Sequence, residues 1–279
     1  MSDTISLLIL VLAVAGIALG IRSLQRKRKL VQEHLAEPMP DAWHNILSKK
    51  VVFFNDLNDD DKAVFEERVQ LFLTTKNIEG VEVEIDDTVR VLVAASAIIP
   101  TFAFPGYNYP DVGTVLVYPN SFDETFQTKR YKGHREFISG MVGNRSMNGI
   151  VILSKPDLIN DFNGLPNENN VGIHEFVHLL DKEDGLIDGI PQILIEQPFV
   201  GPWIHEIKKE MDKIQKGHSD INPYALKNNA EFLAVVSEYF FENPKKFRKN
   251  HLELYQFLCT IFKQDSDFKH SIVLVKTTV

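Results

Sequence analysis

Residues 171–181 read VGIHEFVHLLD, an apolar stretch with two histidines four positions apart and a glutamate directly after the first. Positions i and i+4 of a helix share a face, so His174 and His178 would point to the same side, where one tetrahedral Zn²⁺ can bridge them. Glu175 is rotated by about 100° from His174 and would reach a zinc-bound water without displacing a ligand. A carboxylate placed there can take the proton of the water as it attacks a carbonyl. The spacing therefore predicts metal-assisted hydrolysis.

The alternative interpretation is that both histidines are ordinary core residues. The positions around the motif are apolar, including Ile173, Phe176, Val177 and Leu179, which predicts a buried helix. Buried imidazoles beside a buried carboxylate need a polar partner, and a metal ion would supply one. Chance would produce this four-letter spacing in roughly 2% of chains of this composition. The pattern favours zinc.

The third protein ligand stays open when only the spacing is considered. Asp184 would be that ligand if Asp181 stood for the glycine of an H-E-x-x-H-x-x-G-x-x-H pattern, but an aspartate does not supply the glycine turn. Glu231 and Glu238 are the other candidates, because they lie seven residues apart on one face of a predicted helix. The acidic loop with Asp181, Asp184 and Asp188 could support the histidines or simply be solvated.

The remaining sequence predicts short strands before the motif and mainly helices after it, which is typical of an α+β domain. The apolar run at 89–102 fits either a helix or a strand that leads into a helix, since periodicity does not separate them. The predicted strands lie at 81–85, 113–119 and 148–154, and the predicted helices at 57–77, 169–181, 202–217 and 228–244, with one or two more in 244–265.

The strand at 148–154 directly precedes the motif helix and has two possible roles. It could be the sheet edge along which a peptide pairs its backbone, or an internal strand that is paired on both sides.

The N-terminus predicts a membrane anchor. Ile5 to Ile21 carries no charge and would be about 26 Å long as a helix, close to the thickness of a bilayer core. A cleaved signal peptide would have its positive charge before the apolar run, whereas Asp3 precedes this one and five basic residues follow it by position 29. The positive-inside rule then places the body in the cytoplasm. The expected organisation is an anchor with its basic flank in 1–29, a tether in 30–44 and a catalytic domain in 45–279.

Composition excludes other classes of protein. A net charge of -8 argues against a nucleic-acid-binding surface. The single Cys259 excludes an intramolecular disulfide and a cysteine-based zinc site.

Two blocks, GIHEFVHLLDKEDGLIDGIP (172–191) and PYALKNNAEFLAVVSEYFFENP (223–244), resemble the Mlc titration factor A family of zinc metallopeptidases. The catalytic core of that family is similar to the protease domain of anthrax lethal factor, which implies a zincin-like α+β fold with a small mixed sheet packed by helices. The family places a tyrosine seven residues before its third-ligand glutamate. Tyr224 and Glu231 have that spacing, so the resemblance implies Glu231 as the ligand and Tyr224 as a helper at the substrate oxyanion.

Together these features predict a membrane-anchored, zinc-dependent peptidase that acts on a peptide or protein substrate. A regulatory binding protein that holds a transcription factor at the membrane is the main rival, because the family resemblance also implies binding of the glucose repressor Mlc. An intact Glu175 favours the enzyme, since binding alone needs no general base. A purely structural zinc is disfavoured, because three protein ligands leave a fourth position open.

Overall fold

The computed structural model describes residues 37–122, 138–143, 149–163, 169–265 and 271–272 of the chain. Pro40 onward forms one compact unit. The predicted anchor in 1–29 lies outside the described residues and stays a prediction. Within the described ranges, no helix combines the length and the apolar character needed to cross a membrane.

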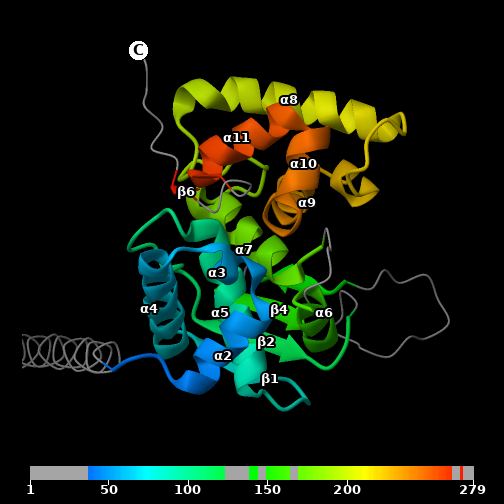
Figure 1. The fold of residues 1–279 in the computed structure, drawn as a ribbon. Coiled ribbons are helices and arrows are strands. Elements are labelled where there is room, and N and C mark those ends of the chain that lie inside the picture. The colour runs from blue at the N-terminus through cyan, green and yellow to red at the C-terminus, as the bar shows by residue number, and fades with distance from the viewer. Residues whose placement is uncertain (1–36, 123–137, 144–148, 164–168, 266–270, 273–279) are drawn as a thin grey trace, which may run out of the picture. The chain divides into compact units, whose positions relative to one another are not determined.

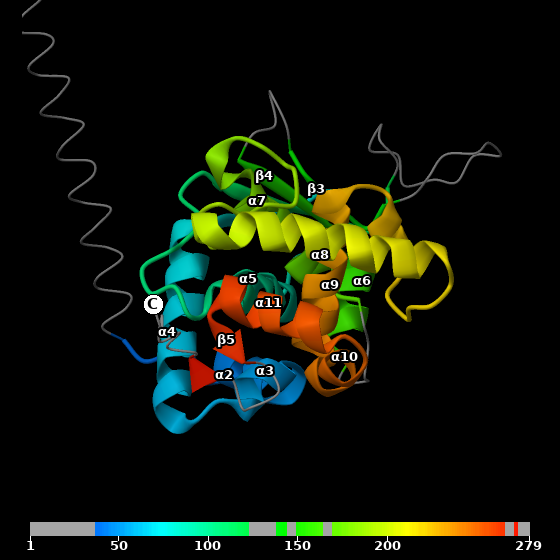
Figure 2. The ribbon, with the colours of Figure 1, turned by 90° about the horizontal axis from the view of Figure 1, so that it is seen from above.

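A four-stranded sheet supports one side of the unit, with the strand order β1-β2-β4-β3; β1, β2 and β4 are labelled in Figure 1 and β3 in Figure 2. β1, β2 and β4 are parallel, and β3 pairs with β4 in the antiparallel sense. The strands at 113–119 and 148–154 are confirmed as β2 and β4. The strands span Asn77–Gly80 (β1), Thr114–Tyr118 (β2), Gly140–Val142 (β3) and Ile150–Ser154 (β4).

The structure decides between the two roles left open for the strand at 148–154, and it overturns one expected strand. β4 is internal, because it pairs with β2 on one side and β3 on the other, so β3 forms the edge. The strand expected at 81–85 is wrong, since β1 ends at Gly80 and the chain turns there. A Cβ on Gly80 would lie 1.9 Å from the carbonyl oxygen of Val83, so the backbone folds tightly on itself and 81–85 leaves the sheet.

The apolar run that the sequence left open forms the buried helix α5 (Asp87–Thr101). The Asp86 side chain accepts a hydrogen bond from the backbone of Val89 and so caps the first turn, as a helix start requires. α5 packs against α4 (Asp59–Thr75), α2 (Asp41–Lys50) and α7 (Val171–Asp181). The contact with α7 is close, because a Cβ on Gly172 would lie 2.1 Å from the Ser96 hydroxyl oxygen.

The second half of the unit is helical and covers α7 on the side away from the sheet (Figure 1). Seen from above, α8 lies across α9 and beside α11 (Figure 2). Phe240, Phe241 and Phe262 pack their rings together between α9 and α11. The elements not yet given are α3 (Val52–Asp56), α6 (Lys155–Asp161), η2 (Lys182–Asp184), α8 (Gln197–Gln215), η3 (Pro223–Leu226), α9 (Asn229–Glu242), α10 (Pro244–Asn250), α11 (Leu252–Phe262), β5 (Gln264–Asp265) and β6 (Ser271–Ile272). The predicted α+β class is confirmed.

Candidate metal centre

The motif helix α7 is capped at its start by Asn170, whose side-chain oxygen accepts a hydrogen bond from the backbone of Ile173 at 3.0 Å. Its apolar residues, among them Ile173, Phe176 and Val177, are fully or almost fully buried. This burial fixes the rotation of the helix, because the apolar face has to meet α5 and the sheet. His174 and His178 are then left on the face toward α9, each with a side chain that is 13% exposed.

Glu231 joins the two histidines from the first turn of α9. The Asn228 side chain caps that helix by accepting from the Glu231 backbone at 2.9 Å, which fixes the position of this first turn. Glu231 Oε2 lies 3.0 Å from His174 Nε2 and 3.3 Å from His178 Nε2, and the two Nε2 atoms are 3.1 Å apart. The structure thus brings together the three residues that the sequence analysis proposed as ligands.

These three donor atoms suit a metal ion. Tetrahedral zinc with nitrogen and oxygen ligands at about 2.0–2.1 Å requires ligand atoms about 3.3 Å apart, close to the spacing of this triangle. They are also the donor types, imidazole nitrogen and carboxylate oxygen, that zinc binds in catalytic sites. Among the described residues this is the one group of three or more histidine, cysteine or carboxylate side chains close enough to hold an ion.

Glu238, the alternative third ligand, has a different position. Its Oε1 accepts from His174 Nδ1 at 2.7 Å, and its Oε2 accepts from the Asn170 backbone at 2.6 Å. A carboxylate on Nδ1 holds the proton there and leaves Nε2 free for a metal. Burial opposes a charge on His174, but Glu238 and Glu231 raise the pKa of this imidazole well above its usual range. A metal would therefore displace a proton when it binds.

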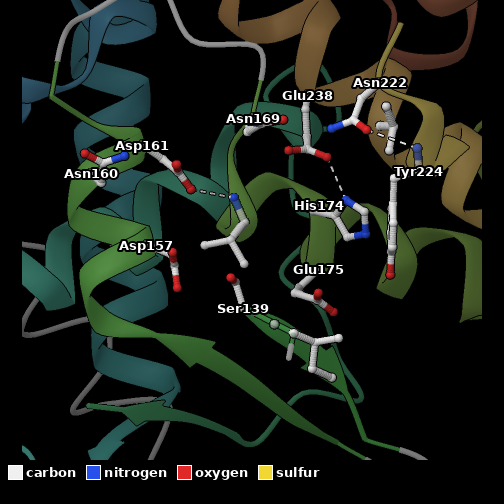
Figure 3. A pocket seen from close by; sticks show the side chains of 14 residues that line it. Ser139, Asp157, Asn160, Asp161, Asn169, His174, Glu175, Asn222, Tyr224 and Glu238 are labelled. Carbon is white, nitrogen blue, oxygen red and sulfur yellow. Dashed lines mark hydrogen bonds and ion pairs between the residues drawn. The ribbon is translucent and has the colours of Figure 1, made fainter. Parts of the chain in front are cut away.

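Glu175 lies outside the donor triangle but beside it. Its buried side chain lines a cavity of about 420 Å³, together with His174, Tyr224 and Ser139 (Figure 3). Burial raises the pKa of Glu175, and the nearby His174 and His178 oppose that rise. A raised carboxyl pKa suits a group that must both accept and release a proton near neutral pH.

The edge strand β3 packs against the Glu175 side chain at Gly140. A Cβ on Gly140 would lie 2.4 Å from Glu175 Oε1 and 2.6 Å from its Cγ, so only glycine fits against this side chain as it stands. Sequence reasoning missed Gly140, because it lies 35 residues before Glu175 and no local pattern joins the two.

Tyr224 stands on the other side of His174, with ring centroids 6.2 Å apart. It lies in η3, whose start is fixed by Asn222 accepting from the Tyr224 backbone at 3.0 Å. The Tyr224 hydroxyl donates to Glu231 Oε1 at 3.3 Å. Lys227, which the sequence analysis did not single out, donates to both the hydroxyl and that carboxylate oxygen.

The acidic loop after α7 does not reach the histidines through hydrogen bonds in the described structure. Asp184 accepts from the Leu186 backbone, Asp188 from Ile190, and Asp181 from Gly189 at 2.9 Å. These aspartates shape their own loop. The sequence analysis considered these aspartates as hydrogen-bond partners of the histidines. For His174, that partner is Glu238 instead.

The mixed sheet, the helix with two histidines and the glutamate from a second helix define a metallopeptidase-like protein. The family model described as glucose-regulated metallo-peptidase M90 matches residues 21–263, and the chain belongs to this family. The resemblance to Mlc titration factor A proteins is thereby confirmed.

Three relatives give the extent of the similarity. An uncharacterized protein of Synechocystis sp. is 29% identical over 240 residues, which cover 84% of this chain and 86% of the relative. Mlc titration factor A of Escherichia fergusonii is 28% identical over 235 residues, covering 80% and 86%. Mlc titration factor A of Cronobacter sakazakii is 27% identical over 244 residues, covering 83% and 89%.

Proposed function

We propose that this protein is a zinc-dependent peptidase in which Glu175 is the general base. The observation that carries the proposal is a group of three donor atoms beside a separate buried carboxylate, Glu175, which shares a cavity with one of the three donors, His174. A purely structural metal site needs no such carboxylate. Membership of a metallopeptidase family supports the same reading.

His174, His178 and Glu231 would hold the zinc. When bound, zinc supplies a Lewis acid that polarises the peptide carbonyl and lowers the pKa of a water molecule. Glu175 accepts the proton of the attacking water and passes it to the nitrogen of the leaving amine.

Tyr224 and the edge strand would position the substrate. The Tyr224 hydroxyl donates a hydrogen bond to the carbonyl oxygen as negative charge develops there. Ser139 and Gly140 line the cavity at the sheet edge, so a peptide that adds to β3 would place its backbone beside Glu175. Main-chain hydrogen bonds of this kind hold a peptide with little regard to its sequence.

Metal analysis combined with hydrolysis of a peptide library tests the proposal. Glu175→Gln should keep its zinc and lose hydrolysis by about 10²- to 10⁴-fold, the usual contribution of a general base. His178→Ala and Glu231→Ala should lose the metal, whereas Asp184→Ala should keep it. Parent-rate hydrolysis by Glu175→Gln would remove Glu175 from the mechanism, and a parent protein that binds no zinc would refute the proposal.

The names of the relatives favour a second candidate role, the capture of a transcription factor, since several are called Mlc titration factor A. Such a partner would be retained by the Glu175→Gln variant, because binding does not need the base. Pull-down from a cell extract with this variant tests the role: equal recovery of a DNA-binding regulator by parent and variant supports it.

We also propose that Ile5 to Ile21 anchors the chain in a membrane, with the catalytic domain in the cytoplasm. The uncharged run and the basic residues that follow it support this placement. The family match begins at residue 21, so most of the run lies outside it.

A further inference from the structure

Lys227 contacts two groups of the site at once. Its ammonium nitrogen lies 3.0 Å from the Tyr224 hydroxyl oxygen and 3.2 Å from Glu231 Oε1, and it stands 4.9 Å from the centre of the Tyr224 ring. The hydrogen bond to Tyr224, together with Glu231, raises the pKa of Lys227, so the side chain is cationic at neutral pH.

The three side chains form a closed triangle of hydrogen bonds. A lysine ammonium only donates, so the Tyr224 oxygen accepts from Lys227 and its proton points to Glu231 Oε1. The other oxygen of the same carboxylate, Oε2, is the one that faces the two histidines. Lys227 therefore acts on the outer side of a candidate metal ligand.

This arrangement answers a problem in the proposed reaction. If Tyr224 turns its proton toward a substrate oxygen, Glu231 Oε1 loses one hydrogen-bond donor. Lys227 still donates a hydrogen bond to Oε1. The carboxylate can therefore keep its orientation, with Oε2 toward the two histidines. The ammonium also lies near the place where Tyr224 would meet negative charge.

We propose that Lys227 is a positioning residue that fixes the orientation of the Glu231 carboxylate and of the Tyr224 hydroxyl during the reaction. This inference rests on the proposed peptidase function. Nothing in the metal-ligand motif requires a lysine there. Lys227 lies between η3 and α9, three residues after the tyrosine and four before the glutamate.

The competing explanation is an ordinary surface ion pair, which typically stabilises a protein little. The chain offers a matched control in Asp212 and Lys216, also four residues apart and bonded, with side chains 56% and 60% exposed. In the pair with Lys227, the Glu231 side chain is only 13% exposed. A surface role predicts that both lysines behave alike when replaced.

The test compares Lys227→Met, Lys227→Arg and Lys216→Met in the full chain. Zinc affinity is measured by chelator competition in the Glu175→Gln background, where hydrolysis plays no part. Lys227→Met should weaken zinc about tenfold, Lys227→Arg should recover much of that loss, and Lys216→Met should match the parent. Equal affinities for Lys227→Met and Lys216→Met would overturn the inference.

Kinetics then test the link to Tyr224. Lys227→Met should lower kcat about tenfold with KM nearly unchanged, and the same change in a Tyr224→Phe background should have little further effect on kcat. An undiminished loss in that background would overturn the link. If the parent hydrolyses no peptide, the proposed function fails, and the zinc titration alone still decides whether Lys227 positions Glu231.

Discussion

Replacing Gly140 with alanine should abolish most hydrolysis while leaving the metal in place. The new Cβ would lie 2.4 Å from Glu175 Oε1, 2.6 Å from Cγ and 2.8 Å from Cδ. Non-bonded atoms of this size normally stay about 3.5 Å apart, so the carboxylate has to move by about 1 Å. A displacement of that size at a reacting group costs about 10²-fold in rate.

The cost in stability should be small by comparison, because the atoms that must move belong to a side chain and not to the backbone. An off-rotamer glutamate costs about 0.5–1.5 kcal/mol, which lowers the melting temperature by only a few degrees in a domain of this size. Zinc content should stay at the parent level, since Glu175 is outside the donor triangle.

The assay pairs metal analysis with peptide hydrolysis, and Gly113→Ala is the control. Apart from its chain neighbours, no residue would have an atom within 4 Å of a Cβ on Gly113, so this variant should match the parent in both measurements. A Gly140→Ala protein that contains zinc and hydrolyses peptides at the parent rate would refute the assigned role of Glu175. Loss of zinc would show instead that β3 supports the metal ligands.

Three further outcomes are expected. Glu238→Gln should weaken zinc about 10- to 100-fold, because His174 loses its charged partner; an unchanged chelator titration would contradict this. Burial raises the pKa of Glu242 to about 8 from 4.5, so the folded state binds the proton more tightly and stability should fall as pH rises between these values. The free energy of unfolding, measured with urea at pH 5.5 and 8, should therefore fall less in Glu242→Gln than in the parent. An equal fall in both proteins would show that Glu242 does not cause it. A reporter fused after Val279 should be cytoplasmic, and periplasmic alkaline phosphatase activity would overturn the proposed orientation.

The parts of the site that the sequence predicted are those that depend on local geometry. A helix over the motif follows from its apolar pattern, and the common face of His174 and His178 follows from the helical repeat. The N-cap residues Asn170 and Asn228, which the sequence analysis did not name, also act within three residues of themselves. Such relations need no knowledge of how distant elements pack.

The remaining parts depend on how two helices meet. Glu231 and Glu238 are two turns apart on one face of α9, and spacing alone did not separate them. The packing of α9 against α7 decides between them. It places Glu231 Oε2 beside the Nε2 atoms of both histidines, and it places Glu238 Oε1 beside His174 Nδ1. The error over the strand at 81–85 has a similar origin, because the turn at Gly80 is a contact between backbone atoms that no alternation of side chains reports.

The separation of His174 and Glu231 by 57 residues has a consequence for the synthesis of this protein. A ribosome that adds about 5–20 residues per second needs roughly 3–11 s to pass from the first of these codons to the second. Until Glu231 is added, the nascent chain lacks the carboxylate that α9 contributes to the group of His174, His178 and Glu231. A growing chain therefore cannot complete this group of three ligands before α9 has been synthesised, so the proposed peptidase would gain its metal centre only when most of the chain exists.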